Sequence, residues 1–505
     1  MRLRRLPRLG VAGCLLLTLA TAGCRRPPPP DVPLRIAHES EALSFDPTLL
    51  PETATMSVLG NFYEGLVRLD ADNRMLPALA ESWLTVDTHT WLFKIRPGVR
   101  FHDGSPLTAR DVKESLERAL HEPSSGVKGY LSAISEVAVD GEAVRIRTSR
   151  PDPLLLNRLS WVFITPHGRG QQGFERPVGT GPYEFLGRRD GEIEAAAFPQ
   201  YWNGPPRIRR VRFVTVPAGE VVKALRSGSV DILRWVPEVA LPEIRAVPGF
   251  QVVTSEGLSA YYLWFSGEGR LSGQANPFVD PRVRRAVSRA IDRQALVAPM
   301  AGLALPLTQL VHHGIFGYAP ELPPLPHDPD SARHLLAEAG YPDGFTTTLC
   351  FRDDADLEPV AATLQAMLAE VGIRLELHPL PWKAMLDQAW IERQDPLFLA
   401  GWQFDEGDAW GFLRDCIYTQ DPTRTYGAYN PGFSSAEMDR LIDQGDQIFD
   451  RLERRAHYQA IMRLAQDEMP LVPLYARKDT YAVATRLRWR PRIDGNLRAA
   501  EMSWK

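Results

Sequence analysis

The sequence predicts an α/β protein with a mostly parallel sheet. A β-rich run ends at residues 349–351, and apolar residues then recur at helical spacing from 360 to 371, where Gly372 stops the pattern. In the next segment Ile373, Leu375 and Leu377 alternate with polar residues, as in a half-buried strand. Strand, helix, glycine stop and strand are the parts of a βαβ unit, which joins parallel strands.

Helix starts elsewhere are marked by residues that suit the N-cap position. Two of them precede a proline, which favours the first helical position. Two others have an acidic residue three positions on, which completes a capping box. Gly340 is expected to end one of these helices. The predicted N-cap residues are Thr108, Asp280, Asp328 and Ser434.

Length and composition limit the possible functions. The chain has 505 residues, too many for one core, so two or more domains are expected. Its net charge of −4 does not favour nucleic acid as a partner. Four cysteines are present without a CxxC pair or an accompanying histidine cluster, so no metal site and no cofactor are expected.

The N-terminus has the pattern of an export signal. Four arginines precede a short apolar run, 9–20, which leads through small residues into Cys24. This junction resembles the bacterial lipobox, whose cysteine is lipidated, although Thr21 stands where leucine is usual. Residues 27–30 are prolines, which favour a stiff extended spacer. The interpretation is a membrane-anchored protein outside the cytoplasm; a plain signal peptide with an incidental cysteine is the alternative.

Few arrangements suggest catalysis. His102 and Asp103 adjoin, but Asp-Gly followed by Ser-Pro is a turn signal. His312 and His313 are adjacent and should point in opposite directions on an extended segment, and no third ligand has suitable spacing. The P-loop, the nucleophile elbow and the dinucleotide fingerprint are all missing from the sequence. No catalytic residue is predicted.

Aromatic residues are more informative. Trp402 and Trp410 bracket an acidic loop that contains Phe404, Asp405 and Asp408. Carboxylates between tryptophans suit the capture of a cation or amine, although a solvated turn flanked by core tryptophans is an open alternative. The aromatic run 261–265, which includes Tyr262, predicts a core strand with one face at a cleft.

Several motifs together resemble one family. The segments 79–83, 93–104 and 106–112 are similar to the signature of the extracellular solute-binding proteins of family 5, the dipeptide, oligopeptide and nickel-binding group of ABC import systems. Further matching segments follow in the family's order along most of the mature chain. They are 45–47, 179–183, 201–204, 228–231, 280–293, 339–342 and 468–475.

The resemblance implies a two-lobed, periplasmic-binding-protein-like type II fold with an extra subdomain in lobe one. The implied organisation is a signal peptide (1–23), an anchor and linker (24–32), lobe one (33–62, 178–275 and 477–505), its subdomain (63–177) and lobe two (276–476). Asp405 matches the aspartate that meets the peptide amine, and Pro51, Glu52 and Thr53 match a loop that contacts ligand backbone. The implied partners are a peptide and ABC permease subunits, with the protein acting as a monomer.

One departure from the family pattern affects the ligand. Dipeptide binders carry an arginine for the ligand carboxylate near the start of the helix that ends at Gly372, where this chain reads Leu357-Glu358-Pro359. The sequence therefore favours oligopeptides over dipeptides and leaves nickel chelates, haem or oligosaccharides open. A peptide hydrolase using His102 and Asp103 is the alternative from another class. Cys350 and Cys416 are candidates for a disulfide.

Overall fold

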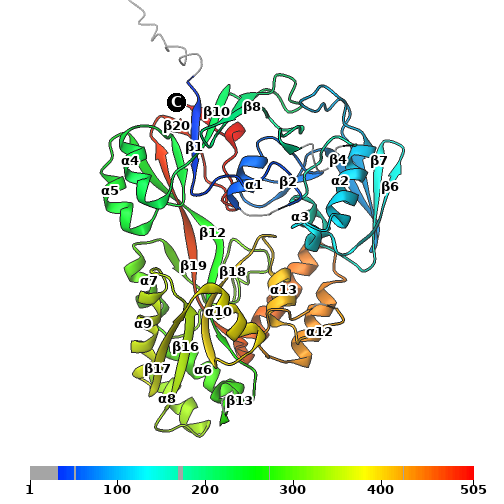
Figure 1. Ribbon diagram of the computed structural model, residues 1–505. Coiled ribbons are helices and arrows are strands. Elements are labelled where there is room, and N and C mark those ends of the chain that lie inside the picture. The colour runs from blue at the N-terminus through cyan, green and yellow to red at the C-terminus, as the bar shows by residue number, and fades with distance from the viewer. Residues whose placement is uncertain (1–31, 50–52, 169–173, 272, 425) are drawn as a thin grey trace, which may run out of the picture. The chain divides into compact units, whose positions relative to one another are not determined.

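The computed structural model describes residues 32–49, 53–168, 174–271, 273–424 and 426–505 (Figure 1). The predicted signal peptide, Cys24, Pro51 and Glu52 lie outside the described residues. Helices and strands alternate along the described chain, which confirms the α/β class. Within this part of the chain, every helix is too short or too polar to span a bilayer.

The largest sheet has eleven strands in the order β17-β16-β18-β12-β19-β11-β1-β10-β9-β8, and β15 pairs with β19 beside this path. The strands are β1 (Leu34–His38), β8 (Tyr183–Arg189), β9 (Glu192–Ala197), β10 (Arg210–Thr215), β11 (Ile232–Arg234), β12 (Phe250–Phe265), β15 (Ala304–Pro306), β16 (Phe345–Arg352), β17 (Ile373–Leu380), β18 (Leu397–Gln403) and β19 (Leu471–Ala484).

The predicted βαβ unit is confirmed. Strands β16 and β17 pair in parallel, and α9 (Glu358–Ala369) connects them. Gly372 has φ +92°, a left-handed conformation that glycine adopts without a steric cost from a Cβ. The prediction of a mostly parallel sheet is wrong, however, because six of the ten pairings in this sheet are antiparallel. Hairpins and two long strands contribute these pairings, and a single βαβ pattern could not reveal them.

The long strands β12 and β19 connect two groups of strands (Figure 1). The first half of β12 pairs with the part of β19 that also pairs with β11. Its second half pairs with β18 and with the other end of β19. The register of β12 on β19 shifts between Glu256 and Ala260. The neighbours of β12 and β19 thus change at this shift: β11 pairs on one side of it and β18 on the other. The lobe boundaries given above remain a prediction.

A separate sheet, in the order β4-β5-β7-β6, falls within the predicted 63–177 subdomain. It has its own hydrophobic core, to which α2 contributes Val112 and Leu116. The bounds are β4 (Ala80–Asp87), β5 (Thr90–Ile95), β6 (Ile134–Asp140), β7 (Ala143–Thr148) and α2 (Ala109–His121).

The remaining helices cover the sheets or lie in the connections (Figure 1). They are α1 (Thr53–Leu59), α3 (Leu155–Leu159), α4 (Val221–Arg226), α5 (Leu241–Arg245), α6 (Pro281–Ala290), α7 (Arg293–Val297), α8 (Pro329–Glu338), α10 (Trp382–Leu386), α11 (Ala409–Phe412), α12 (Ala436–Gly445) and α13 (Arg451–Glu468). Short two-stranded pairs are β2 (Val67–Leu69) with β3 (Met75–Pro77), β13 (Arg270–Leu271) with β14 (Gln274–Ala275), and β20 (Leu487–Arg488) with β21 (Ser503–Trp504).

Three of the four predicted N-caps are confirmed. Thr108 forms a capping box with Asp111, and the side chains of Asp280 and Asp328 accept hydrogen bonds from backbone N–H groups of α6 and α8. The prediction of Ser434 is wrong, because Ser435 caps α12 by accepting a hydrogen bond from the Met438 N–H. The Ser434 hydroxyl instead bonds to Thr419.

Candidate functional site

The acidic loop predicted from the sequence lies between β18 and α11. Strand β18 is buried over Leu397–Ala400 and becomes accessible at its end, so the chain leaves the core just before the loop. Gly407 turns the loop with φ +63°. The backbone N–H of Phe404 donates to the carbonyl of Leu258 in β12, at 2.9 Å. The core sheet therefore fixes where the loop begins.

Asp405 is a half-buried carboxylate that makes no ion pair with any described residue. Burial raises the pKa of Asp405 to about 7, and the negative charge of Glu406 adds to this effect. Hydrogen bonds from Tyr130 and Gln403 oppose the shift. A carboxylate kept from water without a compensating cation favours the arrival of a positive group.

The other acidic residues of the loop are already paired. Glu406 accepts a hydrogen bond from Arg158 Nε at 3.1 Å, and Arg158 also pairs with Asp152 at 2.7 Å. Asp408 is buried, caps α11 through the Trp410 N–H, and pairs with Arg454 at 2.9 Å. In this position Asp408 holds the helix start, and its carboxylate is not available to a ligand.

The remaining predicted ligand residues have different surroundings. Trp402 is half-buried and lies 5.7 Å from the Phe412 ring and 5.5 Å from the Tyr429 ring, measured between ring centroids. Phe404 is buried against Phe412. Tyr262 is fully buried, and its hydroxyl donates to the Leu310 carbonyl at 2.6 Å, so it packs the core and does not face a cleft.

Thr53 is the one member of the predicted lobe-one loop among the described residues. It is half-buried and begins α1.

A pocket of ≈160 Å³ adjoins the start of the acidic loop. Trp402 and Gln403 line it together with Trp382 from α10 and Arg352 from the end of β16. Arg352 is the one cation among the described residues that line this pocket, and it pairs with Asp354. The pocket therefore offers aromatic rings and one guanidinium next to the end of β18.

A larger pocket, ≈320 Å³, has no residue of the acidic loop among the described residues that line it. Its lining includes Glu64, which accepts hydrogen bonds from Thr180, Tyr201 and Trp202. Burial raises the pKa of Glu64, and these hydrogen bonds oppose the shift. Both carboxylates accept hydrogen bonds from neutral donors, but Asp405 lies on a loop at the end of β18, next to a pocket that is lined by tryptophan rings and a guanidinium. We take the acidic loop as the candidate site.

His102 and Asp103 do not form a catalytic pair. The His102 ring bonds to the backbone of Gly181 at 3.0 Å, and burial lowers its pKa. Asp103 accepts hydrogen bonds from the backbone and the hydroxyl of Ser105. The segment is the turn that the sequence indicated, and each side chain stabilises it separately.

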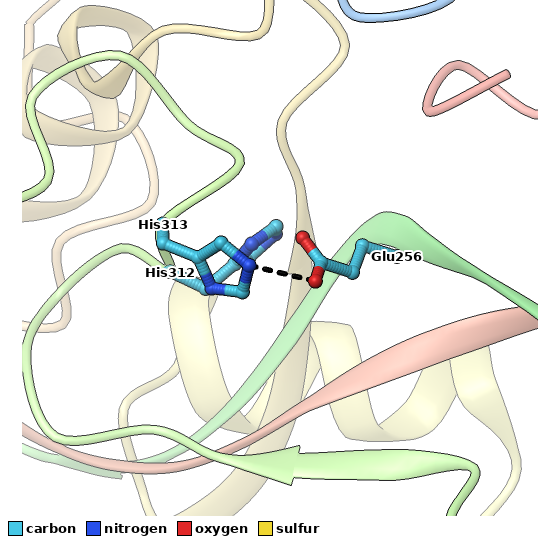
Figure 2. A group of neighbouring side chains, drawn as sticks. All are labelled: Glu256, His312 and His313. Carbon is cyan, nitrogen blue, oxygen red and sulfur yellow. Dashed lines mark hydrogen bonds and ion pairs between the residues drawn. The ribbon is translucent and has the colours of Figure 1, made fainter.

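Two clusters have side chains of the types that bind metal ions. In the first, ligand atoms of Glu256, His312 and His313 lie within 4.8 Å of one another (Figure 2). The third group, Glu256, comes from β12, more than fifty residues before the histidine pair, so spacing in the sequence did not indicate this proximity. The second cluster is Cys350, His378 and Asp395.

The second cluster is shielded from solvent at its cysteine. Cys350 is fully buried, and burial together with the negative charge of Asp395 raises the pKa of its thiol. A protonated, buried thiol is neither nucleophilic nor ready to bind a metal. Cys350 and Cys416 are both free cysteines, so the candidate disulfide between them is not formed.

Three residues of this region were missed from the sequence. Tyr130 and Gln403 bond to Asp405, and Arg352 lines the adjacent pocket. Tyr130 lies in a short 3₁₀-helix, Lys128–Leu131, without a local motif. Gln403 is a polar residue at the accessible end of β18, directly before the acidic loop. This position was the one local indication of a site residue among the three.

Comparison with known proteins identifies the class. The glutathione-binding protein GsiB of Escherichia coli O1:K1 / APEC is 28% identical over 491 residues, covering 93% of this chain and 92% of the relative. HbpA2 from Haemophilus parasuis shares the fold with a TM-score of 0.84 and 22% identity, covering 94% of this chain and all of that one. The unliganded open form of MppA, a periplasmic murein tripeptide binding protein, shares the fold with a TM-score of 0.82 and 22% sequence identity. The match covers 94% of this chain and 97% of that one.

The fold is thus shared with solved binding proteins such as MppA. The sequence model of the bacterial extracellular solute-binding proteins, family 5 Middle, matches residues 74–422. The chain therefore belongs to that family, whose members are solute-binding components of ABC importers.

Proposed function

We propose that this protein captures short peptides, longer than dipeptides, and delivers them to an ABC permease. Asp405 receives the positively charged amino terminus of the peptide, and Trp402 lies beside the peptide chain. The observation that carries the proposal is the half-buried Asp405 carboxylate without a cation among the described residues. A protonated amine provides that cation together with hydrogen-bond donors.

The opposite end of the peptide needs a cation. Arg352 supports this role because it lines the ≈160 Å³ pocket with Trp382 and Trp402, and its accessible pair with Asp354 is exchanged for the ligand carboxylate. A guanidinium binds a carboxylate through two parallel hydrogen bonds. The names of two relatives also support a short peptide, since GsiB is a glutathione-binding protein and MppA a murein tripeptide binding protein.

A defined peptide mixture tests the proposal. The purified protein is incubated with di-, tri- and pentapeptides, each in a free and an N-acetylated form, and the bound fraction is identified by native mass spectrometry. We expect intact tripeptides and pentapeptides with free amino termini in the complex. Retention of none of these peptides, or equal retention of the acetylated forms, would contradict the proposal. New fragments that vanish in His102→Ala would favour the hydrolase instead.

We also propose that Cys24 anchors the protein to a membrane outside the cytoplasm. Support comes from the basic start, the short apolar run and the small residues before the cysteine. In Cys24→Ser the lipid attachment is lost, so we expect the protein in the soluble fraction or as an uncleaved precursor. Fractionation and intact mass check this result. A variant that stays in the membrane fraction with the mass of the wild type rules out the anchor.

A further inference from the structure

We propose that Glu256, His312 and His313 form a binding site for one divalent transition-metal ion of the zinc and nickel type. This site is independent of the peptide role, because none of its three residues belongs to the acidic loop or lines the pocket beside it.

The geometry brings three ligand types together from two segments (Figure 2). Nε2 of His313 lies 2.6 Å from Oε1 of Glu256, and a ring nitrogen of His312 is within 4.8 Å of both partners. Two ligands of a tetrahedral zinc ion are about 3.3 Å apart, given bond lengths of about 2.0 Å. Small side-chain rotations therefore bring the three atoms into a metal's coordination sphere.

His312 provides the observation that a simple His–Glu pair does not explain. The residue is 5% exposed, and its Nε2 has no well-aligned hydrogen bond among the described residues, the Gly257 backbone offering only a weak contact to the ring. Nδ1 accepts a long hydrogen bond, 3.2 Å, from the Gly314 N–H. A neutral histidine that binds a metal through Nε2 carries its proton on Nδ1. Nδ1 can then no longer accept the hydrogen bond from Gly314, so this long contact is exchanged for a metal bond. A buried, unpaired ring nitrogen is otherwise unfavourable.

The other two groups are accessible from solvent. The side chains of His313 and Glu256 are 52% and 35% exposed, so an ion reaches them from solvent.

The ligand types select the ion. Two imidazoles and one carboxylate suit zinc, nickel or copper, whereas calcium and magnesium prefer sites made only of oxygen atoms. Three protein ligands leave a fourth position for water or a solute.

Glu256 lies at the register shift of β12. The His312–His313 loop continues to Phe316, whose N–H donates to the Gly407 carbonyl at 3.0 Å. A bound ion thus connects this strand to the loop that borders the acidic loop.

Calorimetry with the metal alone tests the site. Untagged exported protein, treated with a chelator and free of peptide, is titrated with Zn²⁺ and Ni²⁺, and with Mg²⁺ and Ca²⁺ for comparison. We expect one Zn²⁺ or Ni²⁺ per chain and no binding of Mg²⁺ or Ca²⁺. His313→Ala and Glu256→Gln should each weaken Zn²⁺ binding at least tenfold, as loss of one of three ligands requires.

Two matched variants identify the site. His334→Ala removes a more accessible histidine that lies 3.2 Å from Glu338 with no third ligand among the described residues, and it should leave the affinity unchanged. His378→Ala removes the accessible histidine of the Cys350 cluster and should also have no effect. The proposal is overturned if the wild type takes up neither Zn²⁺ nor Ni²⁺, or if His313→Ala binds like the wild type.

Discussion

Replacing Asp405 by asparagine is expected to weaken the binding of a peptide with a free amino terminus by about 100-fold or more. Breaking a buried ion pair by removal of one partner costs about 3–5 kcal/mol, and each 1.4 kcal/mol is about a factor of ten in affinity. If Asp405 were a surface group, the effect would be a few-fold at most, since exposed pairs contribute about 0–1 kcal/mol. Isothermal titration calorimetry measures the difference.

The same carboxylate predicts a pH dependence of binding. Burial and Glu406 raise the pKa of Asp405 to about 7 in the ligand-free protein, so the group is protonated below that pH. An ammonium group binds the ionised form, and binding therefore requires loss of this proton. Affinity should fall about tenfold for each pH unit below 7 in the wild type and much less in Asp405→Asn. Above pH 8 the peptide amine itself loses its charge, so the optimum lies between about 7 and 8.

A double comparison isolates the contact. Wild type and Asp405→Asn are each titrated with the free and the N-acetylated peptide, and acetylation should cost affinity in the wild type but little more in the variant. Asp408 is unsuitable as the control that its position on the loop suggests, because it is buried and paired with Arg454. Asp330→Asn, at a 93% exposed side chain, is the matched control. Equal affinity of the wild type for both peptides would exclude amine capture.

Replacement of Arg158 by methionine is expected to give the largest loss of stability. The side chain is 2% exposed, pairs with Asp152 and Glu406, and lies 4.7 Å from the Trp410 ring centroid. Burial lowers the pKa of Arg158, and the two carboxylates more than reverse this, so it stays charged. Methionine keeps the length of the side chain but leaves Asp152 and Glu406 without their cation. We expect a loss of about 3–5 kcal/mol in the free energy of unfolding.

Urea denaturation followed by tryptophan fluorescence measures this loss. Arg110→Met is the matched control, because Arg110 is 67% exposed and its one ion-pair partner among the described residues is Glu114, on the surface of α2. Its expected cost is below about 1 kcal/mol. Asp152→Asn combined with Arg158→Met should cost less than the sum of the two single changes, because the double variant removes one uncompensated charge. A cost for Arg158→Met as small as that of the control would mean that the buried pairs do not stabilise this region.

Arg158 also affects the candidate site indirectly. It comes from α3 and holds Glu406, the neighbour of Asp405, while the adjacent Asn157 donates to the Glu406 carbonyl at 2.8 Å. These bonds fix the loop from a segment nearly 250 residues away in sequence. Weaker peptide binding in Arg158→Met is therefore expected in addition to the loss of stability.

Much of the local structure was predictable because it depends on neighbours in the chain. The βαβ unit from β16 to β17 follows from hydrophobic periodicity and from the left-handed φ of Gly372. The N-caps at Asp280 and Asp328 each need only a backbone N–H a few positions on. The cap of α12 was misplaced by one residue, because Glu437 three positions after Ser434 suggested a capping box, whereas the Ser434 hydroxyl bonds to Thr419 and Ser435 caps the helix.

By itself, then, the sequence determined the α/β class, the family through its ordered motifs, and the acidic loop between tryptophans. Only the tertiary structure decided which carboxylate of that loop is left unpaired, because Arg158 and Arg454 reach Glu406 and Asp408 from distant segments. It alone brought Tyr130 to Asp405, and Glu256 to the histidine pair. The physical reason is that these contacts depend on how strands such as β12 and β19 pair across the sheet. Spacing along the chain carries no information about partners that the sheet brings together.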